Sequence, residues 1–128
     1  MPIQNGIDII EISRIRTAIE NRGDKFKERV FTENEIRYCE SKNNASYQSY
    51  AVRFAAKEAA SKALGYGIGV GIDWKDIEIL NNKNEKPFIV LTGNALIRYS
   101  EMSGRSISVS LSHCRSYAVA QVIIETSV

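Results

Sequence analysis

The sequence predicts an α+β fold in which helices from the first half of the chain pack on an antiparallel sheet. Residues 45–64 are rich in alanine, contain no glycine or proline, and are followed by Gly65, which is typical of one long helix. Residues 77–91 and 106–124 contain the β-branched and alternating segments that are typical of hairpins. Because helical and strand signals are segregated along the chain, they favour an α+β class.

The first elements follow from local signals. Residues 7–12 are rich in β-branched side chains and predict a strand. Ser13 is the expected N-cap of a helix in which Ile15 and Ile19 share one face, and Gly23 is its expected end.

The next two helices have clear signals as well. Thr32 and Glu35 have the spacing of a capping box, so a short helix should run to about Ser41. The long helix over 45–64 carries small side chains on one face, which would let it lie close to a neighbour. That face consists of Val52, Ala56, Ala59 and Ala63.

The second half predicts two hairpins and one helix. Strands over 77–80 and 87–91 are joined by a polar turn, and a helix follows over about 94–102. Residues 106–112 alternate polar and apolar side chains, so they predict a half-buried strand with 117–124 as its antiparallel partner.

The composition is that of an ordinary globular protein. The 128 residues fit a single domain over 1–128, with 44% hydrophobic and 25% charged residues. The net charge of +2 is too small to indicate nucleic-acid binding. Cys39 and Cys114 fit no metal spacing, and neither a secretion signal nor an apolar run of about 18 residues is visible. We therefore expect a cytoplasmic protein with no membrane and no nucleic-acid partner.

Two carboxylates are candidates for chemistry. Asp8 lies inside an apolar strand, where a buried carboxylate needs a proton, a cation or hydrogen-bond donors. The simpler interpretation is an aspartate that faces water or caps the next helix. Glu58 and Lys62 are one helical turn apart, and an exposed pair of this kind contributes only about 0.3–0.5 kcal/mol. Alternatively, Asp8 and Glu58 hold one Mg²⁺ while Lys62 binds a phosphate. Both interpretations stay open at this level.

Further cations and one histidine are weaker candidates. Arg53 and Lys57 are one turn apart and, with Lys62, make the long helix locally basic. They could neutralise an anionic ligand or simply be solvated. His113 is the only histidine, so a multi-histidine metal site is excluded. It is either a turn residue with one local hydrogen bond or a residue that reaches a phosphate from the hairpin end.

The glycine-rich residues 65–71 do not fit a nucleotide-binding loop. Such loops follow a strand and open a helix, whereas this segment follows a predicted helix and leads toward a strand. We expect a flexible turn there. The sequence also lacks the Gly-x-Ser-x-Gly motif of serine hydrolases.

Three segments together resemble the bacterial holo-acyl-carrier-protein synthases, a family of small trimeric phosphopantetheinyl transferases. They are residues 6–12 followed by Arg14, residues 53–65 with the sequence RFAAKEAASKALG, and the closing hairpin from 109 to 120. The resemblance covers nearly the whole chain, and the second segment is the most specific. It implies a phosphopantetheinyl transferase-like fold.

The resemblance also implies an activity. Members of the family transfer 4′-phosphopantetheine from coenzyme A to a serine of apo-acyl carrier protein, releasing adenosine 3′,5′-bisphosphate, and they use Mg²⁺. This reaction supports fatty acid biosynthesis. The expected partners are therefore acyl carrier protein, coenzyme A and further copies of this chain in a homotrimer, with active sites at subunit boundaries.

Residue roles follow from the same resemblance. Asp8 and Glu58 match Mg²⁺ ligands, and Lys62 matches the lysine beside the coenzyme A phosphates. We expect Glu58, Asp8 and Lys62 to be catalytic. Arg53 and His113 match positions near the nucleotide end of coenzyme A. Lys57 is added to the expected coenzyme A-binding set because it lies one turn from Arg53.

A basic face is expected to dock the acidic carrier protein. Arg14 matches a family residue with this role, and Arg22 is assigned to the same face. Arg16 and Lys25 would extend it.

Three positions depart from the usual family pattern. Gln4 replaces a frequent glycine, Tyr66 interrupts a usual Gly-Thr-Gly, and Glu85 precedes Lys86-Pro87 where Gly-Lys-Pro is common. We expect these changes to affect loop conformation and coenzyme A affinity. The alternative functions are a coenzyme A-binding module without catalysis, which would have less need of two carboxylates, and an RNA-associated protein, which the charge disfavours.

Overall fold

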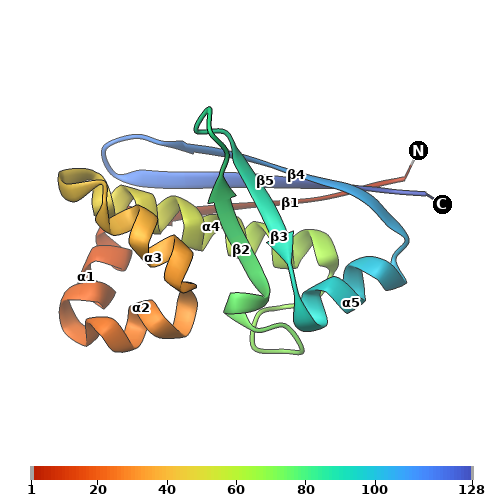
Figure 1. Ribbon diagram of the computed structural model, residues 1–128, viewed down its shortest axis with the longest axis horizontal. Helices are drawn as coiled ribbons and strands as arrows, with labels where there is room; N and C mark the ends of the chain where they lie inside the picture. Colours follow the sequence, from red (N-terminus) through yellow and green to blue (C-terminus); the bar gives the residue numbers. More distant parts are fainter. Residues whose placement is uncertain (1, 128) are drawn as a thin grey trace.

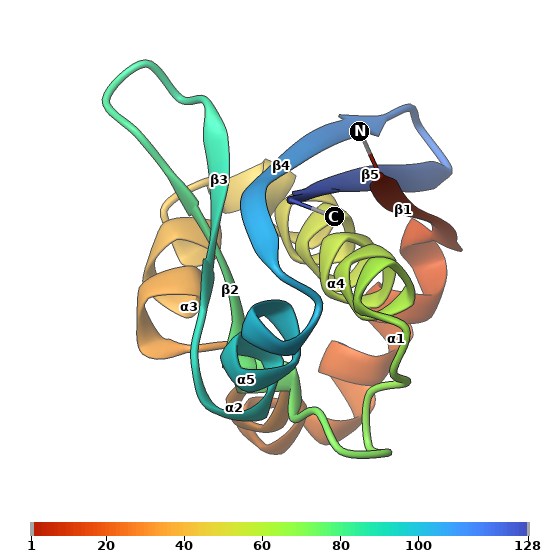
Figure 2. The ribbon, with the colours of Figure 1, turned by 90° about the vertical axis from the view of Figure 1, so that its right-hand side faces the viewer.

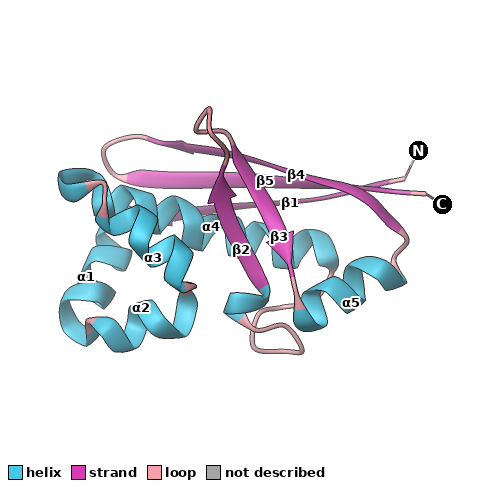
Figure 3. Cartoon of the chain, in the orientation of Figure 1, coloured by secondary structure: helices cyan, strands magenta, loops and turns pink. Residues whose placement is uncertain are grey.

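A computed structural model describes residues 2–127. Figures 1 and 3 show a mixture of helices and antiparallel strands. Short 3₁₀ turns cover Asn43–Ala45 and Trp74–Asp76. The helices and strands follow in the order β1 Ile3–Glu11, α1 Ile12–Arg22, α2 Asp24–Val30, α3 Glu33–Glu40, α4 Ser46–Leu64, β2 Ile77–Asn81, β3 Pro87–Leu91, α5 Gly93–Glu101, β4 Gly104–His113 and β5 Tyr117–Thr126.

The strands form two antiparallel sheets within the described residues. The main sheet has the strand order β1-β5-β4, and β2 pairs with β3 in a separate hairpin. Figure 1 shows α4 running along the main sheet, with α1, α2 and α3 at one end and α5 toward the other. Figure 2 shows the β2–β3 hairpin reaching out beyond the body of the molecule, with its turn farthest from α2 and α5. The predicted α+β class is confirmed.

Helix α4 is the centre of the core. The predicted face of small residues is buried, and their exposed fractions lie between 0% and 5% for Val52, Ala56, Ala59 and Ala63. The main sheet presents small residues to the helix in turn, since Ala118 and Ala120 of β5 are fully buried. Small side chains on both partners let the helix and the sheet approach closely.

Other faces of α4 are buried too, because α1, α3 and β2 also contact it. Phe54 lies among aromatic rings, with its centroid 4.7 Å from that of Trp74 and 6.4 Å from that of Phe26. The helix therefore leaves only a narrow strip, including Glu58 and Lys62, with appreciable solvent exposure.

Most predicted boundaries are confirmed by cap geometry. The Thr32 side chain accepts from the Glu35 N–H, and the Glu35 carboxylate accepts from the Thr32 N–H, so α3 begins with the predicted capping box. Gly65 ends α4 in the left-handed region at φ 84°. Gly23 ends α1 as predicted, and its N–H donates to Ile19.

Three features differ from the prediction. The Ser13 cap is wrong, because α1 begins at Ile12 and, within the described chain, no side chain caps its N-terminus. Helix α2 was not predicted, since its seven residues are too short for a clear apolar period. The pairing of β1 with β5, from Ile3↔Glu125 to Glu11↔Tyr117, joins the two ends of the chain and has no local signal.

The cysteines and the apolar character of the helices are both part of the sequence-based expectations. Cys39 is buried and Cys114 is exposed, and both are free thiols. Among residues 2–127, none of the helices combines the length and the apolar character needed to span a membrane.

Candidate active site

Strand β1 holds Asp8 toward the middle of α4. Within β1, Gly6 and Ile10 are buried against the core, and Asp8 lies between them on the same face of the strand. Its carboxylate Oδ1 lies 3.2 Å from Nζ of Lys62, which also donates to the Ile7 carbonyl at 2.9 Å. The side chain of Asp8 is 19% exposed. Asp8 is therefore engaged with α4 and does not cap α1.

Glu58 joins this pair from the preceding turn of α4. Burial raises the pKa of Glu58 above its ordinary value of 4.5, the negative charge of Asp8 raises it further, and Lys62 opposes both effects. Lys62 forms its ion pair with Asp8. Among the described residues, no ion pair joins Glu58 to Lys62, so the expected exposed i,i+4 pair is absent.

Asp8 and Glu58 are two carboxylates that could hold a Mg²⁺ ion whose other ligands come from water and a substrate. No group of three or more His, Cys, Asp and Glu side chains gathers in the part of the chain that the structure describes. Mg²⁺ commonly takes one or two protein carboxylates and completes its shell with water and substrate phosphates. The negative charge of Asp8 repels that of Glu58 and contributes to the raised Glu58 pKa. A cation bound between the two carboxylates would relieve this repulsion.

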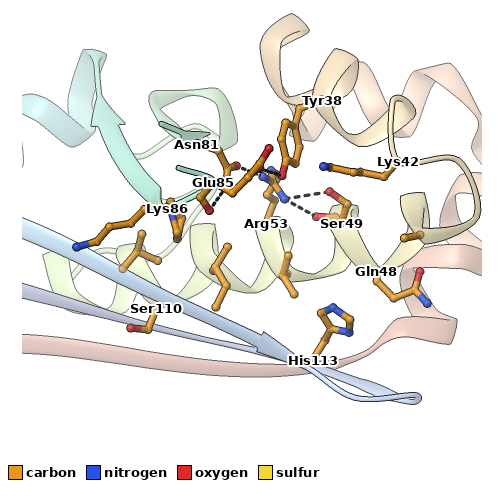
Figure 4. A pocket seen from close by; sticks show the side chains of 15 residues that line it. Tyr38, Lys42, Gln48, Ser49, Arg53, Asn81, Glu85, Lys86, Ser110 and His113 are labelled. Atoms are coloured by element: carbon orange, nitrogen blue, oxygen red, sulfur yellow. Dashed lines mark hydrogen bonds between the residues drawn. The ribbon is translucent and has the colours of Figure 1, made fainter. Parts of the chain in front are cut away.

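A cavity of about 500 Å³ lies farther toward the N-terminus of α4. Figure 4 shows Arg53, Asn81 and Glu85 on one side of this cavity and His113 and Ser110 on the other. It is formed by the C-terminal part of α3 with the residues that follow it, the first half of α4, the β2–β3 turn and β4. The full lining is Tyr38, Lys42, Ala45, Gln48, Ser49, Val52, Arg53, Asn81, Glu85, Lys86, Pro87, Val109, Ser110, Leu111 and His113.

Arg53 is the most constrained cation of the cavity. It is 3% exposed, and its Nη1 donates to the Ser49 carbonyl at 3.2 Å and to the Ser49 hydroxyl at 3.0 Å. Its Nη2 donates to Asn81 Oδ1, and the guanidinium lies 4.3 Å from the Tyr38 ring centroid. Its Nε is buried and has no hydrogen-bond partner among the described residues. A buried cation with an unused donor suits an anionic ligand.

Lys57 does not belong to this cavity, which corrects the prediction that it binds the cofactor. Its side chain is fully buried, and Nζ lies 2.8 Å from Glu35 Oε1. It also donates to the carbonyls of Trp74 and Ile77. Burial lowers the pKa of Lys57, and the Glu35 carboxylate opposes that shift. These contacts link α4 to α3 and β2, and the buried amine is not accessible to a ligand.

Several cavity residues were missed by sequence reasoning. Tyr38 and Lys42 lie on and after α3, and Asn81, Glu85 and Lys86 lie on the hairpin, so only the tertiary fold brings them to Arg53. The one sequence signal that pointed to any of these residues was Glu85, which stands where the family usually has the glycine of Gly-Lys-Pro.

The expected docking residues lie on or just after α1. Arg14 is exposed and lines a shallow depression with Arg22. Arg16 pairs with Glu20 at 3.3 Å and lies 5.5 Å from the Tyr47 ring centroid, and Arg22 lies 4.9 Å from that of Phe26. Lys25 follows on α2 and is exposed.

Known proteins are similar to this chain in sequence and in fold. The family model of the 4′-phosphopantetheinyl transferase superfamily matches residues 4–122. The holo-[acyl-carrier-protein] synthase of Ruminiclostridium cellulolyticum is 57% identical over 119 residues, which cover 93% of this chain and 89% of that protein. The holo-[acyl-carrier-protein] synthase of Koribacter versatilis is 45% identical over 125 residues, covering 98% and 99%.

Solved structures agree with the sequence matches. The fold is similar to that of Helicobacter pylori holo-[acyl-carrier-protein] synthase in complex with coenzyme A, with a TM-score of 0.83 and 36% identity over 94% of this chain and 99% of that one. It is also similar to the enzyme of Bacillus anthracis in complex with coenzyme A (3′,5′-ADP), with a TM-score of 0.79 and 39% identity over 97% and 96%. The chain therefore belongs to the holo-[acyl-carrier-protein] synthases, enzymes of the 4′-phosphopantetheinyl transferase superfamily.

Proposed function

We propose that this enzyme transfers 4′-phosphopantetheine from coenzyme A to a serine of apo-acyl carrier protein and releases adenosine 3′,5′-bisphosphate. The observation that carries the proposal is the meeting of Asp8, Glu58 and Lys62 on the same helix as Arg53, with Glu58 about one and a half turns and Lys62 about two and a half turns further along. Two carboxylates and a cation beside a basic cavity suit a pyrophosphate whose nucleotide end lies in that cavity. The coenzyme A complexes of the relatives from H. pylori and B. anthracis support this assignment.

Substrate positioning is the main task of the cavity. The nucleotide end of coenzyme A would lie between the β2–β3 turn and β4, where Arg53, His113, Lys42 and Lys86 supply positive or hydrogen-bonding groups. The buried Nε of Arg53 is a donor that a phosphate oxygen would satisfy. The diphosphate would then extend along α4 toward Lys62.

The transfer step forms one bond and breaks another. The serine oxygen forms a bond to the β-phosphorus, and the bridging P–O bond breaks, so that the electron pair leaves with adenosine 3′,5′-bisphosphate. A carboxylate oxygen of Glu58 would accept the serine proton, a role suited to a carboxyl group whose pKa is raised by burial. Lys62 would leave Asp8 and donate to a phosphate oxygen as negative charge develops.

Asp8 and Glu58 would together hold Mg²⁺, since their donor set fits that ion. When bound, the ion supplies positive charge to the phosphate oxygens. Asp8 would contribute as a fixed ligand, because β1 holds it against α4 next to Gly6.

We further propose that residues 1–128 act as one domain within a cytoplasmic homotrimer that serves fatty acid biosynthesis. The outer face of the main sheet supports assembly, because it exposes Ile3, Ile7 and Ile9 of β1 at 58%, 57% and 65% and Ile123 of β5 at 38%. Exposed isoleucines on one sheet face are typical of a subunit interface. An acidic carrier protein would dock on the basic residues of α1.

The direct test is incubation with apo-acyl carrier protein, coenzyme A and Mg²⁺, followed by intact-mass measurement of the carrier. We expect a mass gain of one phosphopantetheine that is lost with EDTA and in Asp8→Ala. The exposed Arg105→Ala variant at the far end of the main sheet is a control and should keep the gain. A folded protein that binds coenzyme A and modifies no carrier would overturn the proposal in favour of a binding module.

A further inference from the structure

The β2–β3 turn holds a non-glycine residue in a conformation that favours glycine. Asn82 Oδ1 accepts from the backbone N–H groups of Asn84 at 2.8 Å and Lys86 at 3.0 Å, and the Asn82 N–H donates to the Lys86 carbonyl at 2.9 Å. This closed turn places Glu85 at φ 61°, in the left-handed region. Side chains are disfavoured there, so the carboxylate of Glu85 is expected to make a compensating contact.

That contact is a hydrogen bond to Tyr38, which lines the same cavity. The Tyr38 hydroxyl donates to Glu85 Oε2 at 2.7 Å, which links α3 to a turn 47 residues later. The Tyr38 ring in turn lies against two cations, with Arg53 4.3 Å and Lys42 4.6 Å from its centroid.

The same turn reaches Arg53 by a second path. Asn81 Nδ2 donates to the Glu85 carbonyl at 3.0 Å, and Asn81 Oδ1 accepts from Arg53. Tyr38, Glu85, Asn81 and Arg53 are thus linked in a ring by three side-chain contacts and one hydrogen bond to the Glu85 carbonyl, and all four residues line the cavity, as Figure 4 shows.

We infer that the Tyr38–Glu85 hydrogen bond determines the affinity of this enzyme for the nucleotide end of coenzyme A. The inference rests on the proposed function. The bond fixes the turn against α3 before the ligand arrives, so binding does not have to order the turn. It also engages a carboxylate that would otherwise be free to approach an anionic ligand among Lys42, Arg53 and Lys86.

A double-mutant cycle tests the pair. The variants are Tyr38→Phe, Glu85→Gly and their combination, and glycine is chosen because it suits φ 61° and leaves the turn unstrained. Calorimetric titration with coenzyme A, and separately with adenosine 3′,5′-bisphosphate, should show about fivefold weaker binding in Tyr38→Phe, the value expected for one hydrogen bond. In the Glu85→Gly background, the same change should alter affinity less than about twofold. Steady-state assays should show a raised KM for coenzyme A, with kcat and the KM for carrier protein unchanged.

The other possible results of the double-mutant cycle would each overturn the inference. Equal weakening by Tyr38→Phe in both backgrounds would assign the effect to the tyrosine hydroxyl acting without Glu85 and overturn the inference. No weakening in either background would overturn it as well. If the unmodified enzyme binds neither ligand, the proposed function fails together with the inference. If it binds both ligands and the cycle is additive, only the inference fails. Thermal unfolding of each variant verifies that the fold is kept.

Discussion

Gly6 of β1 lies directly against Ala59 of α4: a Cβ at Gly6 would fall 2.0 Å from the Ala59 carbonyl oxygen and 2.9 Å from the Ala63 nitrogen. The obstacle is backbone of the central helix, so it cannot rotate away. This contact sets the distance between the strand that carries Asp8 and the helix that carries Glu58 and Lys62.

Gly6→Ala should therefore destabilise the protein by about 3 kcal/mol, the upper end of the usual range for overpacking. Chemical denaturation measures the loss. Gly67→Ala is the matched control, because no atom of the described residues outside the adjacent chain lies within 4 Å of its added Cβ, and it should change stability by less than about 1 kcal/mol. Similar losses in the two variants would mean that the helix can move away from β1.

Local physics explains which elements were predictable. The capping box at Thr32 and the left-handed Gly65 depend on atoms within a few residues, so the sequence predicts them directly. The small face of α4 was also predictable, because its spacing is that of the helix itself. Helix α2 and the β1–β5 pairing were not, since the first is short and the second joins segments more than 100 residues apart.

The residues of the candidate site also differ in how far the sequence could predict them. Asp8, Glu58 and Lys62 interact with one another in the fold, and Arg53 and His113 line one cavity, while their roles in binding and catalysis stay predictions. Helical spacing alone placed Lys57 beside Arg53, and it could not show that Lys57 is buried, because that burial depends on Glu35, which lies 22 positions earlier on another helix. A lysine one turn from Arg53 looks like a phosphate ligand until its partner is known.

Lys57→Met should be among the most damaging substitutions in α4. It would leave the carboxylate of Glu35 buried without its cation, and breaking a buried pair in this way costs about 3–5 kcal/mol. The control is Arg16→Ala at the exposed Arg16–Glu20 pair, where a loss of less than about 1 kcal/mol is expected. Urea midpoints compare the two. Equal midpoints would show that Glu35 finds other partners or takes up a proton.

The main-sheet face should mediate assembly. Ile9→Glu places a charge at a side chain that is 65% exposed in one protomer, so it should leave the monomer folded and dissociate the proposed trimer. Light scattering after size-exclusion chromatography gives the mass. Thr17→Glu on the exposed side of α1 adds the same charge elsewhere and should leave the trimer intact. A wild-type protein that is monomeric at micromolar concentration would contradict the prediction.

Docking of the carrier protein should depend on the charge of α1. Arg14→Glu reverses an exposed charge and should raise the KM for carrier protein by about tenfold at low salt, while the KM for coenzyme A changes little. Added salt should narrow the difference between variant and wild type, because it screens exposed charges. Arg105→Glu makes the same reversal at the other end of the sheet and serves as the control. An equal effect of both reversals would place the docking surface elsewhere.

Glu58 should make stability and metal binding depend on pH. Its folded pKa lies above 4.5 because of burial and Asp8, so its protonated form stabilises the metal-free fold. That contribution is fully present below the unfolded pKa and is lost as pH rises through the folded pKa. In EDTA, the wild type should therefore lose stability relative to Glu58→Gln across that interval.

Mg²⁺ should reverse this loss, because the ion replaces the proton as the partner of the two carboxylates. Titrations followed by thermal unfolding should show Mg²⁺ stabilising the wild type at neutral pH and much less below pH 4.5, where Glu58 is protonated. Glu58→Gln, which has no proton to exchange, should show weak stabilisation at both pH values. A Mg²⁺ effect that is the same in Glu58→Gln and wild type would remove Glu58 from the metal site and leave it only the role of proton acceptor.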